Sequence, residues 1–288
     1  MTTKPIIVGT DGSQQAMTAV EWAALEASRR KAPLRIVSVE AISPFEIWPR
    51  HHPGVTSPFE HSAAERALAK AAVRATAVAP HIRVDPDLLD GSPAVNLVAS
   101  ASGASMLVVG SRGAGGFATM ILGSVGRYAA TQAAMPVVVV RQENTAVHSR
   151  IAVGVRDCES PGPALLFAFE EAALRKVGLL AVHAWFHPAL RHDREAEGLV
   201  DPAKVGAVAA EELSRTLEPY RERYPAVHVD EQVVNAHPGH ALADLTAHAD
   251  LVVLGRRGGG AVPPGVGAVT HAVLNHAHGP VACVPAVL

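Results

Sequence analysis

Gly110-Ser-Arg-Gly113, followed after nine residues by Gly123-Ser124, joins a short apolar segment to a helical pattern. Residues 105–109 are mostly apolar and partly β-branched, which is typical of a buried strand that ends at the first glycine. Glycines permit a tight turn and let backbone N–H groups approach an anion without interference from a Cβ atom. The residues from Gly123 onward predict a helix, whose first N–H groups and dipole favour a phosphate.

The spacing excludes two common nucleotide-binding motifs. A Walker A loop has a lysine directly before its final Ser or Thr, and Gly123 occupies that place here. A dinucleotide fingerprint follows the first strand, where this chain has Gly9-Thr-Asp-Gly-Ser13 in place of GxGxxG. We therefore expect neither a P-loop hydrolase nor a Rossmann dinucleotide site.

The whole pattern occurs twice in the chain. Pairs of identical residues lie 145 positions apart, namely Ile6 and Ile151, Gly9 and Gly154, Glu26 and Glu171, Pro93 and Pro238, Gly110 and Gly255, and Gly113 and Gly258. Beyond the glycine loop the offset is 144, as for Gly123 and Gly267, so the second loop is one residue shorter. Two copies of about 140 residues match the usual size of a domain. We predict one domain at 1–145, a second at 146–288, and a linker over 142–150.

Strands alternate with helices in both copies. In the first copy we expect strands at 5–9, 34–39, 82–88, 105–109 and 137–140, and helices at 14–30, 62–79, 94–101 and 123–134. In the second copy we expect strands near 151–155, 179–184, 227–234, 251–254 and 281–284, with helices between them. This alternation predicts an α/β fold in which two tandem doubly wound domains each contain a five-stranded parallel sheet with helices on both faces. Ligands of such sheets bind outside the carboxyl ends of the strands, where the strand order reverses.

Gly110, Gly113, Gly123 and Ser124 fill a pattern that resembles the universal stress protein family, whose ATP-binding members carry Gly-x-x-Gly, nine residues, then Gly-Ser/Thr. Asp11-Gly12-Ser13 after an apolar first strand is also similar to this family. The resemblance covers nearly the whole chain, because the pattern is repeated. It implies an adenine nucleotide alpha hydrolase-like fold, with ATP as the ligand and Mg²⁺ carried with the nucleotide.

The spacing and the resemblance together predict a set of nucleotide-binding residues in the first domain. They are Gly9, Thr10, Asp11, Val39, Gly110, Arg112, Gly113, Gly123, Ser124 and Val125. Backbone N–H groups around Gly113 and Gly123 and the Ser124 hydroxyl are expected to hold the phosphates, with Arg112 adding charge at the rim. The resemblance implies that Val39 lines the adenine slot and that Asp11 meets the ribose or the magnesium ion. Asp11 has an alternative role as a cap of the helix that begins at residue 14, although Ser13 is better placed for it.

The second domain departs from this pattern. We expect its glycines, Gly255, Gly258 and Gly267, to form a weaker nucleotide site, because Ala268 replaces the hydroxyl residue and Pro263 and Pro264 cannot donate N–H bonds. Arg156 occupies the place of the aspartate after the first strand, unless a bulge brings Asp157 there. Arg256 and Arg257 keep an anion site plausible in this half.

Composition excludes several other classes of protein. The net charge of −2 gives no reason to expect a nucleic-acid partner or an anionic membrane, and no apolar stretch reaches the ~18 residues of a spanning helix. The chain starts directly with a strand pattern, so we expect a cytoplasmic protein. The two cysteines lie far apart in the sequence, which argues against a disulfide. The histidines are scattered and form no HExxH motif, which argues against a zinc site. The serines lie in no GxSxG motif, which argues against a serine nucleophile. We therefore assign no catalytic and no metal-ligating residue.

Three classes of function remain open. The first is an ATP-binding stress regulator or sensor with little turnover, whose protein partner is unknown. The second is a slow ATPase or phosphotransferase, against which stand the missing Walker lysine and the lack of an evident base. The third is an interaction scaffold that binds no nucleotide. In each case the apolar last strands, at 136–140 and 281–284, predict a pseudo-dimer of tandem domains or a homo-oligomer.

Overall fold

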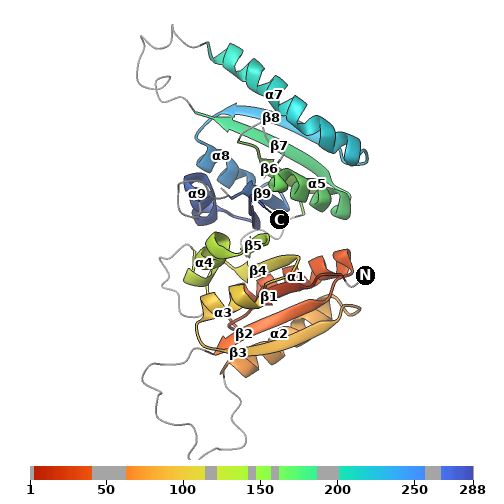
Figure 1. Ribbon diagram of the computed structural model, residues 1–288, viewed down its shortest axis with the longest axis vertical. Helices are drawn as coiled ribbons and strands as arrows, with labels where there is room; N and C mark the ends of the chain where they lie inside the picture. The colour runs from red at the N-terminus through yellow and green to blue at the C-terminus, as the bar shows by residue number, and fades with distance from the viewer. Residues whose placement is uncertain are drawn as a thin grey trace, which may run out of the picture. The chain divides into compact units, whose positions relative to one another are not determined.

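A computed structural model describes residues 3–40, 63–113, 122–141, 147–156, 162–186, 201–256 and 267–287. The chain forms two compact units, Met1–Val140 and Arg141–Leu288, and each contains a sheet and its helices (Figure 1). The domain boundary that the sequence predicts at residue 145 falls within 142–146, outside the described residues, and it stays a prediction.

The first unit alternates strands and helices. In chain order it contains β1 (Ile6–Gly9), α1 (Gln14–Arg30), β2 (Leu34–Glu40), α2 (Ala63–Val78), β3 (Val84–Asp90), α3 (Pro93–Ser100), β4 (Met106–Gly110), α4 (Ser124–Gln132) and β5 (Val137–Val140). The strands are parallel and lie in the order β3-β2-β1-β4-β5. Ile6 pairs with Leu34 of β2 on one side and with Met106 of β4 on the other. The strand order therefore reverses at the crevice between β1 and β4.

The second unit repeats this arrangement. It contains β6 (Arg150–Gly154), α5 (Pro163–Arg175), β7 (Gly178–Trp185), α7 (Pro202–Arg223), β8 (Val229–Asn235), α8 (Pro238–Leu245), β9 (Leu251–Gly255), α9 (Ala268–His276) and β10 (Val281–Val284). Its parallel strands lie in the order β8-β7-β6-β9-β10. The predicted fold class, two tandem doubly wound α/β units, is confirmed.

The helix ends follow from local chemistry. The Ser13 hydroxyl accepts a hydrogen bond from the Ala16 N–H at 3.3 Å, so Ser13 is the cap of α1, as its position predicts. Lys31 after α1 and Lys176 after α5 adopt the left-handed conformation, with φ of 51° and 57°. In both cases the backbone N–H of the lysine donates to carbonyl groups of the last helical turn, which is a common way for a helix to end. Among the described residues, no helix is both long and apolar enough to span a membrane.

Small aliphatic side chains make up much of the cores. In the first unit β1 is buried along Ile6, Ile7 and Val8. The face of α1 that is buried carries alanines spaced three or four residues apart, at positions 16, 19, 23 and 27. Because alanine has a short side chain, this face allows the helix to lie close to the neighbouring strands, and α1 packs on both β1 and β4.

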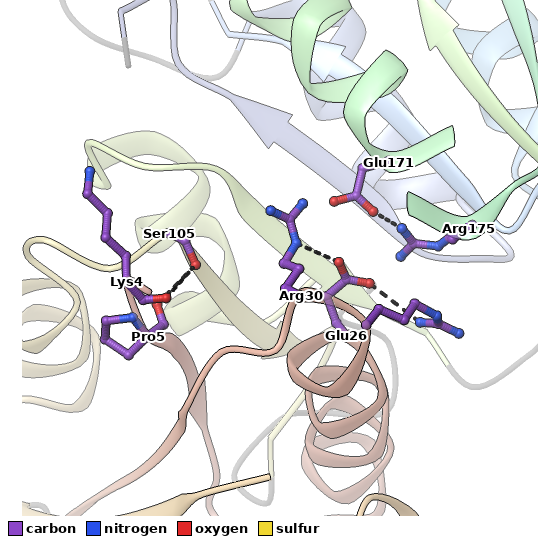
Figure 2. Close-up of polar contacts among 8 residues, drawn as sticks. Lys4, Pro5, Glu26, Arg30, Ser105, Glu171 and Arg175 are labelled. Atoms are coloured by element: carbon purple, nitrogen blue, oxygen red, sulfur yellow. Dashed lines mark hydrogen bonds and ion pairs between the residues drawn. The ribbon is translucent and has the colours of Figure 1, made fainter. Parts of the chain in front are cut away.

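A buried glutamate forms an ion pair on the first helix of each unit (Figure 2). The Glu26 side chain is fully buried and accepts from Arg30 Nε at 2.6 Å and from Arg29 at 3.4 Å. In the second unit the equally buried Glu171 pairs with Arg175, four residues later. A buried carboxylate is costly unless a cation and hydrogen bonds compensate it, so these arginines are structural partners.

The amino ends of β1 and β4 are also held together. The Ser105 hydroxyl donates to the Pro5 carbonyl at 3.1 Å, and the Ser105 N–H donates to the same carbonyl at 2.9 Å. Figure 2 shows this contact beside the start of β1. The two strands are therefore joined by the residues that directly precede them, next to the pairing of Ile6 with Met106.

Replacing Arg30 by Met is expected to lower the free energy of unfolding by about 2 kcal/mol, because Glu26 loses its nearer cation. Replacing Arg29, which is more exposed and farther from the carboxylate, is expected to cost less than about 1 kcal/mol. Urea unfolding of the two variants measures the difference. Equal losses would show that Glu26 does not depend on the Arg30 partner.

Cys283 is expected to be inert in the folded protein. Burial raises the pKa of its thiol to about 12, and the nearby Arg256 guanidinium offsets this only in part. At pH 8.5 the thiol therefore stays protonated, and the thiolate is the reactive form. In a Cys158→Ser chain, which keeps Cys283 as its single cysteine, a disulfide reagent should label the native protein at least tenfold more slowly than the urea-unfolded protein. Comparable rates would contradict this assignment.

Candidate functional site

The candidate site lies at the carboxyl edge of the first sheet, between β1 and β4. Thr10 and Asp11 follow β1, and Gly110 to Gly113 end β4 and begin the glycine loop. This is the point at which the strand order reverses, where open α/β sheets bind their ligands.

Gly110 allows the end of β4 to pack against the start of α1. A Cβ atom at this position would lie 2.9 Å from the carbonyl carbon and oxygen of Gln15 and 3.0 Å from the Ala16 nitrogen. These neighbours are backbone atoms, so they cannot avoid the new methyl group by a change of rotamer, as a flexible side chain could. Glycine is required here by packing, whether or not a ligand binds.

Gly113 and Asp11, which the sequence predicts as site residues, lie directly against each other. A Cβ atom at Gly113 would come within 2.4 Å of Asp11 Oδ2. The other carboxylate oxygen, Oδ1, accepts a hydrogen bond from the Ser13 N–H at 3.0 Å. Asp11 is therefore oriented by the turn before α1 and presents Oδ2 to the glycine loop, while Ser13 caps the helix.

The loop closes onto the start of α4. The Gly123 N–H donates to the Ser111 carbonyl at 2.8 Å, and the Ser111 N–H donates to Val140 at 3.0 Å, which continues the ladder between β4 and β5. The Gly123 N–H is engaged by this carbonyl, so the predicted phosphate donors around Gly123 are the N–H groups that follow it, and their role stays a prediction. Ser124 and Val125 are the first residues of α4, and N–H groups in a first helical turn have no acceptor within the helix. These groups, with the exposed Ser124, are the donors at the edge.

Arg112 adds an unsatisfied donor to the loop. Its Nε is buried and has no hydrogen-bond partner among the described residues. Buried polar groups of native proteins are nearly always paired, so an orphaned cationic donor at this edge is suited to an anion.

Three other predicted residues have structural roles at the same edge. Thr10 is buried, its N–H donates to Val37 at 2.9 Å, and its hydroxyl accepts from the Gly12 N–H at 3.2 Å. Gly9 lies against α3, since a Cβ atom there would meet Leu97 at 2.5 Å. Val39 lies on β2, two residues beyond the partner of Gly9, and is partly exposed.

The second unit has a looser and more cationic edge. Among the described residues, a Cβ atom at Gly255 would meet the Ala164 side chain alone, at an ordinary 3.6 Å. Gly267 precedes α9, whose first residue is Ala268 and offers no hydroxyl. Arg156 follows β6, and burial lowers the pKa of Arg256, the residue after β9. Gly258 lies outside the described residues.

Two features were not predicted from the sequence. One is the role of Ser111, whose backbone closes the loop; the spacing of the glycines carries no signal for it. The other is a cavity of about 400 Å³ in the second unit, between β7 and α7. His183 and Trp185, two residues apart and hence on one face of β7, are the signal that sequence inspection could have used.

Replacing Gly110 by Ala is expected to lower the free energy of unfolding by about 2 kcal/mol, because the new methyl group meets rigid backbone. The matched change Gly255→Ala has room for the methyl group and should shift stability by less than about 0.5 kcal/mol. Urea unfolding of the two variants tests this asymmetry. Equal effects would mean that the end of β4 is not tightly packed.

The comparisons with known proteins agree with this architecture. The model of the Universal stress protein family matches residues 2–141 and 148–285. Universal stress protein Rv2005c of Mycobacterium tuberculosis is 32% identical over 284 residues, which cover 96% of this chain and 95% of that protein. Universal stress protein Rv2623 of the same organism is 33% identical over 290 residues, with 96% and 94% covered.

A solved structure supports the fold over the same length. The crystal structure of a universal stress protein from Archaeoglobus fulgidus is similar with a TM-score of 0.69 and 20% identity, covering 99% of this chain and 97% of that chain. The two matched segments correspond to the two doubly wound units described above. The chain belongs to the universal stress protein family, as a tandem member with two copies of the domain.

Proposed function

We propose that the first unit binds ATP at the carboxyl edge between β1 and β4, and that nucleotide occupancy regulates the protein with little turnover. The observation that carries this proposal is the contact of Asp11 Oδ2 with Gly113. It joins the turn after β1 to Gly113, the residue that follows Arg112 in the glycine loop. Adenine as the base is inferred from the resemblance of the loop to ATP-binding members of the family.

Each part of the edge fits one part of the nucleotide. The N–H groups of the first turn of α4, the Ser124 hydroxyl and the buried Arg112 Nε are donors for phosphate oxygens. Asp11 Oδ2 suits a magnesium ion, which proteins often hold through one or two carboxylates together with the phosphates. Val39 supplies apolar surface on the neighbouring strand for the base.

Low turnover is proposed for a chemical reason. Phosphoryl transfer needs a group that positions or activates the attacking water and cations that stabilise the transition state. Asp11, the carboxylate beside Gly113, already accepts a hydrogen bond from the Ser13 N–H through Oδ1. A carboxylate held in this way is better suited to bind a metal ion than to act as a general base. The loop also has glycine where a Walker motif has its lysine.

We further propose that the two units act as a pseudo-dimer within a cytoplasmic protein that regulates a partner still to be identified. The proposal rests on the repeated strand order and on the unequal glycine loops, which favour the first unit as the main nucleotide-binding unit. Light scattering measures whether the chain is a monomer or associates further.

Calorimetry with ATP and Mg²⁺ tests the site. Replacing Gly113 by Ala should weaken ATP binding about tenfold, because the methyl group displaces the Asp11 carboxylate. Replacing Ser124 by Ala should weaken binding about fivefold through the loss of one hydroxyl donor. The matched Gly255→Ala change in the second unit should leave the main affinity within about twofold, since one extra methyl group has room there.

Phosphate release measured in the same samples separates the alternatives. Tight ATP binding with negligible phosphate release supports the regulator, whereas rapid phosphate release would favour the slow ATPase instead. No binding of ATP, ADP or AMP to the folded protein would favour the nucleotide-free scaffold. Unchanged affinity in a folded Gly113→Ala variant would remove the site from this edge.

A further inference from the structure

We infer that the second unit carries a separate binding site for a small aromatic amine, in the cavity of about 400 Å³ between β7 and α7. Sites for small molecules usually range from roughly 300 to 1,000 Å³, so the cavity suits a single-ring ligand. Its lining combines apolar side chains with three polar groups, which together determine the ligand chemistry.

The cavity is formed by the amino-terminal part of α7. Helices α2 and α7 occupy equivalent places in the two repeats, since they end 145 positions apart, at Val78 and Arg223. With the same offset, Ala63, the first described residue of α2, corresponds to Val208 of α7. Lys204 and Val205, which line the cavity, lie before that point on α7. Asp201 caps this end by accepting from the Ala203 N–H at 3.0 Å. The wall of the cavity is therefore a capped helix, and Figure 1 shows α7 running along β7 and β8.

The walls present apolar surface to solvent. Val205 and Val208 are 36% and 57% exposed, and with Ala209 they are spaced three and four residues apart, on one face of α7. Trp185 lines the opposite side, on β7. A planar ring placed between an indole and aliphatic side chains would remove this surface from water, which favours aromatic ligands.

His183 supplies a hydrogen-bond acceptor in the lining of the cavity. Its Nδ1 lies 3.0 Å from the Val155 carbonyl oxygen, and a carbonyl can only accept, so Nδ1 carries the proton. In the neutral ring Nε2 is then the acceptor, and His183 lines the cavity. A hydroxyl group on the ligand ring matches this acceptor.

The rim favours a cation over an anion. Glu212 lines the cavity, and its carboxylate forms no hydrogen bond or ion pair within the described parts of the chain. Lys204 is the cation of the lining, and its ammonium group lies 3.9 Å from Asp201. The Lys204 ammonium group is thus already paired with Asp201, which does not line the cavity, whereas the Glu212 carboxylate has no such partner among the described residues. The uncompensated charge of the described lining is therefore negative, and a ligand amine is preferred to a ligand carboxylate.

The cavity is distinct from the nucleotide edge of the same unit. The glycine loop of the second unit follows β9, whereas the cavity is built on β7, and β6 lies between these two strands. The counterpart of Val39 in this unit is Ala184, 145 positions later. Because neighbouring residues of a strand point to opposite faces, His183 and Trp185 lie on the other face of β7 from Ala184. The inference does not rest on the proposed ATP site, and the two can be tested independently.

Calorimetry on the full chain with tyramine as the probe tests the inference, with phenethylamine and 4-hydroxyphenylacetate as matched compounds. Tyramine is expected to bind, while loss of the ring hydroxyl or replacement of the amine by a carboxylate should weaken binding about tenfold. Replacing Val208 by Arg should fill the mouth and abolish binding. The control Ala207→Arg adds the same charge at an exposed neighbour that does not line the cavity and should change the affinity less than twofold.

A second variant separates recognition from folding. In His183→Asn the amide can still donate to the Val155 carbonyl, but the Nε2 acceptor is lost. Tyramine affinity should then fall about tenfold, to the level of phenethylamine, while ATP affinity stays unchanged. No tyramine binding to the folded chain, equal loss in both arginine variants, or equal affinity for tyramine and 4-hydroxyphenylacetate would overturn the inference.

Discussion

The packing of the end of β4 against the backbone at the start of α1 is the constraint on which the candidate site depends. Gly110 permits this approach, since any side chain there would meet the Gln15 carbonyl. The approach brings the glycine loop after β4 next to the turn after β1, where the Asp11 carboxylate meets Gly113. The loop then returns to α4 through the bond between Gly123 and Ser111. The edge is thus held in place by contacts within the protein itself.

The two copies keep the same structural framework while their edges differ. Both retain a buried glutamate paired with an arginine four residues later on the first helix, at Glu26 and at Glu171. Both also retain the strand order and the left-handed lysine after that helix. At the edge, by contrast, an aspartate and a serine in the first unit are replaced by Arg156 and Ala268 in the second. The framework is set by burial, which tolerates little change, whereas the edge faces solvent and can diverge.

The contrast between Gly110 and Gly255 shows why equal motifs need not have equal roles. The two glycines occupy the same position in their copies, yet within the described parts of the chain only the first lies against rigid backbone. The second unit has its distinctive feature elsewhere, in the cavity beneath the start of α7. Duplication of a stable fold allows one copy to retain a site while the other acquires new surface chemistry.

The sequence by itself determined the fold class, the duplication and nearly all of the strands and helices, because these follow from local periodicity, glycine punctuation and the 145-residue repeat. It also placed the cap at Ser13, since capping depends on neighbours within one turn. Only the tertiary structure decided that Asp11 faces Gly113, that the Gly123 N–H is already engaged, and that His183 and the start of α7 line one open cavity. These contacts join segments far apart in the chain, and their distances depend on how strands and helices pack, which no local pattern of residues encodes.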